Sequence, residues 1–372
     1  MARSHPARYD SAVSAPGRSI ALVDLDAFYA AVEVLDRPEL AGQPLLIGGS
    51  PNGRGVVAAA SYEARAFGCH SAMPMAHAVR LCPEAVVLSP RFPAYREHSK
   101  RVMAVLARES DLVEQVSIDE AYVDLTRAAA SMTEAEGLAH RMQGRIRVEC
   151  GLPSSVGLAP SKLVAKVACE SGKPQGFAVV RAGEEAAFLA PLAVERLPGI
   201  GPRSAQRLKA QGLHTLGEVA AAPVALLLRT LGPWGAVLQR RAGGEDGSPV
   251  SPERETKSIS AEETFAEDVD QRAPLLELLE AMADRLARSL AKQGLAGRTV
   301  TLKLRYADFT TLTRSASVHA ATASADVIRA QALALLDANW APGQPVRLIG
   351  VGISKLRPVH APGQLPMEEP EA

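Results

Sequence analysis

The chain has 372 residues, more than one compact core usually accommodates, so several domains are expected. Its 47% hydrophobic and 22% charged residues are ordinary for a globular protein, and no apolar run is long enough for a membrane-spanning helix. With 41 basic and 41 acidic residues the net charge is zero, so overall charge indicates no particular partner.

The N-terminus and the cysteines carry no structural motif. Residues 1–18 lack the apolar core of a secretory signal and are predicted to be a disordered tail. The four cysteines lie far apart without a CxxC pair, which predicts neither a zinc site nor a disulfide framework. This usage fits a reducing cytoplasm.

Strands and helices alternate in the first half of the chain. Residues 19–24 form an apolar strand that ends in a carboxylate, and a helix over 27–40 follows with Asp26 as its N-cap. Two short strands lead to a short helix that ends at Gly68. A helix over 96–110, a strand over 115–124, a helix over 133–149 and a strand-to-helix segment over 154–168 complete a β-α-β-β-α-β order. This order predicts a ferredoxin-like sheet with an insertion at about 35–92.

The second half divides at a polar segment. Residues 185–245 are predicted to be almost entirely helical, and residues 246–256, with Pro249 and Pro252, form an interdomain linker. A helix over 274–293, strands over 298–310 and 311–319, a helix over 323–339 and a strand over 346–356 then form a second small unit. The predicted fold class is therefore α+β and multidomain.

Two adjacent acids, Asp119 and Glu120, interrupt the strand QVSIDEAYVD. Successive side chains of a strand point to opposite faces, so both acids cannot face an apolar core. A third acid, Asp24 or Asp26, ends the first strand, and acids that converge repel one another unless cations lie between them. Carboxylates suit Mg²⁺, and two such ions support in-line phosphoryl transfer. The alternative is a surface hairpin with two exposed acids and an unrelated helix cap.

Other residues could contact a ligand that carries phosphates. Tyr62 and Arg65 share one face of a helical turn that could clasp phosphates, and Lys173 lies on a glycine-flanked turn; solvated side chains are the alternative. The aromatic residues Phe28 and Tyr29 directly follow the first strand, where both could simply be core residues.

Two segments could bind the DNA backbone. LPGIGPRSAQRLKAQGL has the form of a helix-hairpin-helix, in which Gly199 and Gly201 let backbone N–H groups approach a phosphate; an αα-turn without a DNA role is the alternative. From Arg285 to His319 there are seven basic residues, including Lys303, Arg305 and Arg314, against one acid. Such a run either binds a phosphate backbone or is a solvated face.

Six ordered motifs resemble those of a Y-family translesion DNA polymerase, and most of all its DNA polymerase IV branch. They are VDLDAFYAAVE, SYEARAFG, SIDEAYVD, SKLVAKVACESGKPQG, LPGIGPRSAQRL and KSISAEETF, and the resemblance runs from Ser19 to Arg357. It implies a palm (19–34 and 93–184), fingers (35–92), a helix-hairpin-helix thumb (185–245), a little finger (257–357) and a tail (358–372).

The resemblance also implies roles for individual residues. Two Mg²⁺ ions would be held by Asp24, Asp119, Glu120 and the carbonyl of Leu25, so it selects Asp24 over Asp26. Tyr62, Arg65 and Lys173 match triphosphate-binding positions, and Tyr29 matches a steric gate beneath the sugar with Phe28 beside it. The small residues Ala58, Ala59 and Ala72 match positions that roof the nascent base pair in the family. Ala59 departs from the threonine frequent in the family, which removes a hydroxyl contact to the triphosphate.

The implied activity is low-fidelity, template-directed addition of deoxynucleotides to a primer 3′ end. No residues are left over for a proofreading exonuclease, and a monomer is expected. Gln364-Leu365-Pro366-Met367 weakly resembles a sliding-clamp peptide. Two alternatives are another two-metal enzyme, such as a nucleotidyl cyclase, and a non-catalytic DNA-binding protein. The first leaves the hairpin at 197–213 unexplained, and the second predicts the loss of at least one of the three acids.

Overall fold

The computed structural model describes residues 17–253 and 255–359, which belong to two compact units, Met1–Glu253 and Arg254–Ala372. Their boundary falls within the predicted linker. Nearly all of the two predicted tails, including the clamp-like segment 364–367, lies outside the described residues. In the described part of the chain, no helix is both long and apolar enough to cross a membrane.

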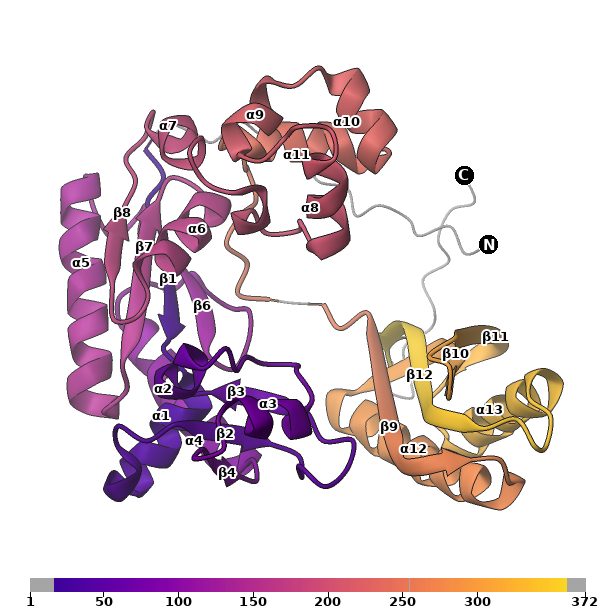
Figure 1. Ribbon diagram of the computed structural model, residues 1–372. Helices are drawn as coiled ribbons and strands as arrows, with labels where there is room; N and C mark the ends of the chain where they lie inside the picture. Colours follow the sequence, from indigo (N-terminus) through magenta and orange to yellow (C-terminus); the bar gives the residue numbers. More distant parts are fainter. Residues whose placement is uncertain (1–16, 254, 360–372) are drawn as a thin grey trace. The chain divides into compact units, whose positions relative to one another are not determined.

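The first unit is built on a five-stranded sheet ordered β5-β6-β1-β7-β8 (Figure 1). Its central strand β1 pairs antiparallel with β6 on one side and β7 on the other. Helix α4 (Phe92–Leu106) precedes β5, and α5 (Met132–Arg145), continued by a π-helical turn (Ile146–Cys150), joins β6 to β7. This is the predicted ferredoxin-like order, with β8 added at one edge. The strands are β1 Ile20–Leu25, β5 Val113–Gln115, β6 Glu120–Asp124, β7 Ser154–Ala159 and β8 Phe177–Val179.

The alternation of side chains along β1 decides which face carries Asp24. Ile20 and Leu22 pack in a cluster with helix α6 (Lys162–Gly172), whereas Ala21 and Val23 pack in a second cluster with α1 (Phe28–Asp36), α4 and α5. Because side chains two apart share a face, Asp24 lies on the α6 side of the sheet.

Three predictions near the first acids are wrong. Residues 115–124 are not one strand, because β5 and β6 are separated by a turn in which Val116 and Ser117 both donate their backbone N–H to the Glu120 carbonyl. Asp26 is not the N-cap of α1 (Phe28–Asp36); Ala27 occupies that position with φ of 44°, and no side chain caps the helix. The predicted helix over 27–40 also ends before Pro38, and a 3-10 turn (Pro38–Leu40) follows.

The insertion forms a small sheet with its own core. Strands β2 (Leu45–Gly48), β3 (Val57–Ala60) and β4 (Val86–Leu88) are ordered β3-β2-β4, with helices α2 (Tyr62–Ala66) and α3 (Met75–Leu81). Buried side chains from β2, β3 and both helices form one hydrophobic cluster. Neither α3 nor β4 was predicted.

The region 185–245 is helical, as predicted, and its buried residues join the cluster of β1 and α6. The first part of the predicted linker is also attached to this unit, since Leu163 donates its N–H to the Asp246 carboxylate and Ser251 donates its N–H to Glu114. The helices are α7 Glu185–Leu189, a 3-10 turn Val194–Arg196, α8 Pro202–Lys209, α9 Leu216–Ala221, α10 Val224–Leu231 and α11 Trp234–Ala242.

The second unit is a four-stranded antiparallel sheet ordered β11-β10-β12-β9, with α12 and α13 packed on one face. Its first strand, β9, was not predicted because it is rich in exposed acids. The elements are β9 Ser258–Val269, α12 Arg272–Gln293, β10 Leu295–Tyr306, β11 Thr311–Thr322, α13 Ala325–Asn339 and β12 Val346–Pro358.

Candidate active site

Three carboxylates meet where β1 and β6 run side by side. Asp24 is the direct cross-strand partner of Glu120, and such partners project from the same face of a sheet. Asp119 lies in the turn just before β6, and its carbonyl accepts the N–H of Leu25 at 2.9 Å. The pairing of the two strands therefore brings together acids that lie almost 100 residues apart in sequence.

Two lysines neutralise two of these acids. Lys173 Nζ lies 2.8 Å from Asp24 Oδ2, and Lys166 Nζ lies 2.8 Å from Glu120 Oε2. Burial raises the pKa of Asp24 to about 6, although the Lys173 ammonium acts in the opposite direction. Lys166 was not predicted as a site residue. The pattern that could have indicated it is its four-residue spacing from Lys162 on α6, which places both lysines on one face of the helix.

Most of the residues predicted to bind metal or nucleotide line one pocket of about 360 Å³. Asp24 and Asp119 lie in its wall together with the basic residues Arg65 and Lys173. Glu120, Tyr62 and Ala72 do not line it, and Ser71 and Ser117, which were not predicted, do. The other predicted residues in its wall are Leu25, Phe28, Tyr29, Ala58 and Ala59.

The ring of Tyr29 is held by other aromatic rings. It stacks on Tyr95 with ring centroids 4.2 Å apart and planes 10° apart, and it packs against Phe28 at 5.7 Å. Tyr95 is fully buried and donates its hydroxyl to Glu33 Oε1 at 2.6 Å. Tyr29 is therefore rigidly placed at the edge of the pocket.

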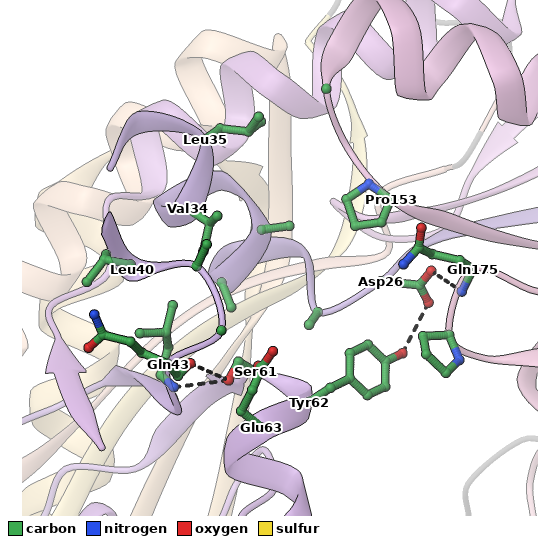
Figure 2. A pocket seen from close by; sticks show the side chains of 18 residues that line it. Asp26, Val34, Leu35, Leu40, Gln43, Ser61, Tyr62, Glu63, Pro153 and Gln175 are labelled. Atoms are coloured by element: carbon green, nitrogen blue, oxygen red, sulfur yellow. Dashed lines mark hydrogen bonds between the residues drawn. The ribbon is translucent and has the colours of Figure 1, made fainter. Parts of the chain in front are cut away.

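Tyr62 and Arg65 contact each other, as their spacing predicts. The Arg65 guanidinium lies over the Tyr62 ring, 4.6 Å from its centroid, and Arg65 Nε donates to the Ala60 carbonyl at 3.0 Å. The Tyr62 hydroxyl donates to Asp26 at 3.1 Å, and burial together with Asp26 raises the pKa of Tyr62 to about 12. Tyr62 lines a second, larger pocket (Figure 2).

The donor set fits a hard divalent cation. Among the described residues no three His, Cys, Asp or Glu side chains form a ready-made metal centre, and Lys166 and Lys173 lie against two of the three acids. The Asp24 and Asp119 carboxylates nevertheless line the same pocket, and oxygen donors of this kind suit Mg²⁺.

The predicted hairpin begins a helix as expected. Gly199 has φ of 99°, a conformation that favours glycine, and a Cβ there would lie 3.3 Å from the Trp234 ring. Gly201 is the N-cap of α8, and no side chain caps that helix end. Backbone N–H groups of α8 are thus left for another acceptor.

The basic residues of the second unit lie on two different faces. Lys303 and Arg305 alternate with the buried Leu302 and Leu304, so they project from the face opposite the helices. Arg314 pairs across the strands with Leu302 and therefore projects toward the helix side, where its Nε donates to Asn339 of α13 at 3.1 Å. The structure brings Lys303 and Arg305 together and separates Arg314 from them.

Known proteins match the chain along nearly all of its length. The model of the impB/mucB/samB family matches residues 23–170, and the model of that family's C-terminal domain matches residues 256–367. The chain is 45% identical over 339 residues to a DNA polymerase IV of Alkalilimnicola ehrlichii, covering 91% of this chain and 95% of the relative. It is 44% identical over 341 residues to a DNA polymerase IV of Halorhodospira halophila, covering 92% and 96%. A solved Y-family DNA polymerase chimera superposes with a TM-score of 0.81 at 28% identity, covering 91% of this chain and 98% of the chimera.

Fold, site and matches together define a DNA-directed DNA polymerase. The chain belongs to the Y-family of translesion DNA polymerases, in its DNA polymerase IV branch. The family predicted from the six motifs is confirmed, and the nucleotidyl cyclase and non-catalytic alternatives are set aside. Dependence on a divalent metal is general in this family and accords with the donor set of the pocket.

Proposed function

We propose that the chain adds deoxynucleotides to the 3′ end of a primer on a DNA template, with low fidelity and with two Mg²⁺ ions. The observation that carries this proposal is the composition of one pocket, which is lined by carboxylates, two basic side chains and an aromatic ring. A nucleoside triphosphate needs these three kinds of group for its metal ions, its phosphates and its sugar.

The acids would hold the metal ions. Asp24, Asp119, Glu120 and the Leu25 carbonyl are the proposed ligands, and bound ions would stabilise the attacking and leaving oxygens of the transferred phosphoryl group. Lys173 now pairs with Asp24, so this ammonium is within reach of a triphosphate that occupies the pocket.

The other pocket residues would select the nucleotide. Arg65 and Lys173, with the Tyr62 ring under Arg65, would bind the triphosphate, and Tyr29 would lie beneath the sugar and exclude a 2′-hydroxyl. Ala58 and Ala59 leave a roomy roof, and a loose pocket discriminates weakly between base pairs. Ala59 also lacks the hydroxyl that would assist at the triphosphate.

Duplex DNA would contact both units. We propose that the α8 N-terminus, with Gly199 and Gly201, binds one phosphate, and that Lys303 and Arg305 bind others from the open face of the second sheet. The palm, fingers, thumb and little finger remain the proposed domains. A monomer is expected, and clamp binding through residues 364–367 stays a prediction about a segment outside the described residues.

Templated primer extension with Mg²⁺ and the four deoxynucleotides tests the proposal. Asp119→Ala and Glu120→Ala should each abolish extension while duplex binding stays largely intact, because the acids act through metal in the transition state. Asp111, an exposed acid just before β5, is the matched control, and Asp111→Ala should extend normally. Extension at a near-normal rate by either site variant would refute the metal assignment.

The same preparation tests proofreading. A labelled primer with a mismatched 3′ end should keep its length in Mg²⁺ without nucleotides, because the elements of the described residues are all accounted for by the four proposed domains. Metal-dependent shortening of that primer by the pure protein would contradict this expectation.

A further inference from the structure

Asp26 is a buried carboxylate that the roles proposed above leave unused. Only 2% of its surface is exposed, and it does not cap α1. Its oxygens accept three neutral donors: the Tyr62 hydroxyl at 3.1 Å, the Ser155 hydroxyl at 2.9 and 3.0 Å, and the Gln175 backbone N–H at 2.8 Å. A buried carboxylate held by neutral donors is costly unless each of those bonds is made.

The donors come from the two segments that carry the proposed triphosphate-binding residues. Tyr62 opens α2 and supports the Arg65 guanidinium on its ring. Gln175 lies two residues after Lys173, in a turn where its own φ is 53°, an uncommon conformation for a residue with a side chain. Asp26 is thus the point at which the Tyr62 side and the Lys173 side of the pocket are joined.

Ser155 extends this junction into the sheet. It is fully buried on β7, its hydroxyl donates to Asp26, and the same oxygen accepts the N–H of Gly176 at 3.2 Å. The turn that carries Lys173 is therefore held by two backbone N–H groups, one donated to Asp26 and the other to Ser155 of β7.

Packing alone does not hold the Tyr62 ring. The ring borders a pocket of about 430 Å³ whose far wall is apolar, including Val34, Leu35 and Leu40. Figure 2 shows the Tyr62 hydroxyl pointing away from that wall, toward Asp26, with Gln175 on the other side of the carboxylate. Without the hydrogen bond the Tyr62 ring has room to turn into this pocket, and the Arg65 guanidinium would then lose the ring on which it lies.

We infer that Asp26 is a positioning residue, which fixes Tyr62 and the turn after Lys173 so that both sides of the pocket bind one triphosphate together. This inference rests on the proposed polymerase function. Asp26 does not line the pocket of Asp24 and Asp119, so its removal should weaken nucleotide binding more than the chemical step.

The chemistry of the donors calls for a carboxylate at this position. An ionised carboxylate only accepts hydrogen bonds, and its three partners all donate. In Asp26→Asn the size is kept, but the side chain is neutral and only its amide oxygen accepts, so the Tyr62 hydroxyl and the Gln175 N–H, which bind different oxygens of Asp26, can no longer both donate to it. We expect the KM for the deoxynucleotide to rise about 10- to 100-fold, with kcat falling much less, because bonds to a charged acceptor are among the stronger ones.

The experiment is single-nucleotide insertion kinetics on a primer-template, with duplex affinity and a thermal melt measured on the same proteins. The variants are Asp26→Asn, Tyr62→Phe and their double mutant, and the control is Glu63→Gln, an exposed acid beside Tyr62 on the same pocket. Asp26→Asn should raise KM at unchanged duplex affinity, the double mutant should be no worse than Asp26→Asn alone, and Glu63→Gln should match the wild type.

Several outcomes would overturn the inference. They are a KM within twofold of wild type, a lower KM (Asp26 then competes with the triphosphate for the Tyr62 hydroxyl), a kcat loss as large as the KM effect, or fully additive effects in the double mutant. If Asp26→Asn does not fold, Ser155→Ala removes one of the same bonds and should raise KM to a smaller extent. A wild-type protein that fails to extend the primer would refute the proposed function instead, so the two failures are distinguishable.

Discussion

Asp24 should cost the folded protein stability, and its neutral isostere should restore it. This carboxyl is only 7% exposed, and burial raises its pKa from 3.8 to about 6 even with Lys173 beside it. A carboxyl whose pKa is higher in the folded state binds its proton more tightly there, so ionisation at neutral pH disfavours folding. Asp24→Asn should therefore stabilise the protein while it abolishes polymerisation.

The magnitude follows from the two pKa values. A rise from 3.8 to about 6 is a little over two factors of ten, which corresponds to about 3 kcal/mol at 1.36 kcal/mol each. The penalty is absent below the unfolded pKa, grows between the two values and is constant above about pH 6. The attraction of Lys173 is already contained in this figure, since it acts on the same pKa.

Thermal unfolding of wild type and Asp24→Asn in EDTA at two pH values is the assay. At about pH 7.5 the variant should gain up to about 3 kcal/mol, and at about pH 4.5 only about 1 kcal/mol. For a unit of this size each kcal/mol is worth roughly 2–4 °C in melting temperature. Asp119→Asn is the control, because Asp119 is only partly buried and accepts the nearby Ser117 hydroxyl at 2.6 Å. A variant less stable than wild type at neutral pH, or a gain equal at both pH values, would refute the reasoning.

Two further predictions concern the sugar and the DNA backbone. Tyr29→Ala should raise ribonucleotide incorporation by about 10- to 100-fold with a smaller loss of deoxynucleotide activity, because the ring that would clash with the 2′-hydroxyl is removed. Unchanged sugar selectivity with a lower melting temperature would make Tyr29 an ordinary core residue. Replacing Lys303 and Arg305 by Ala should reduce the slope of log duplex affinity against log salt by about 2, whereas Arg314→Ala should change it less. The opposite ranking in the salt titration would place the DNA on the helix side of that sheet.

The sequence predicted the sheet well because alternation is a local property. The order of strands and helices sufficed for the ferredoxin-like arrangement, and side-chain parity places Asp24 with Ile20 and Leu22. Parity could not separate Asp24 from Asp26, since both have the same parity and β1 ends between them. The backbone decides between them: at Ala27 it takes a left-handed conformation, and Asp26 turns toward the Tyr62 hydroxyl instead of capping α1.

Where the prediction was wrong, hydrogen bonds outweighed residue preference. Val116 and Ile118 favour strands, yet both lie in the turn between β5 and β6. The Glu120 carbonyl accepts two backbone N–H groups from this turn, and the Ser117 hydroxyl donates to Asp119. A turn of this kind places one acid at the end of the hairpin and the next at the start of a strand, so adjacent acids need not point to opposite faces of one sheet.

Register also explains why a basic run in the sequence is a poor measure of a basic surface. The turn over residues 307–310 pairs Lys303 with Thr313, and this pairing alone sends Arg314 to the other face. Gly350 on β12 is the cross-strand partner of both Lys303 on β10 and Glu262 on β9. Because Gly350 has no side chain, the Lys303 ammonium reaches across it to the Glu262 carboxylate at 2.6 Å. A phosphate would have to compete with this acid for Lys303. The charge that the open face offers to DNA is therefore set by which strands are neighbours, a long-range property that counting basic residues along the chain does not contain.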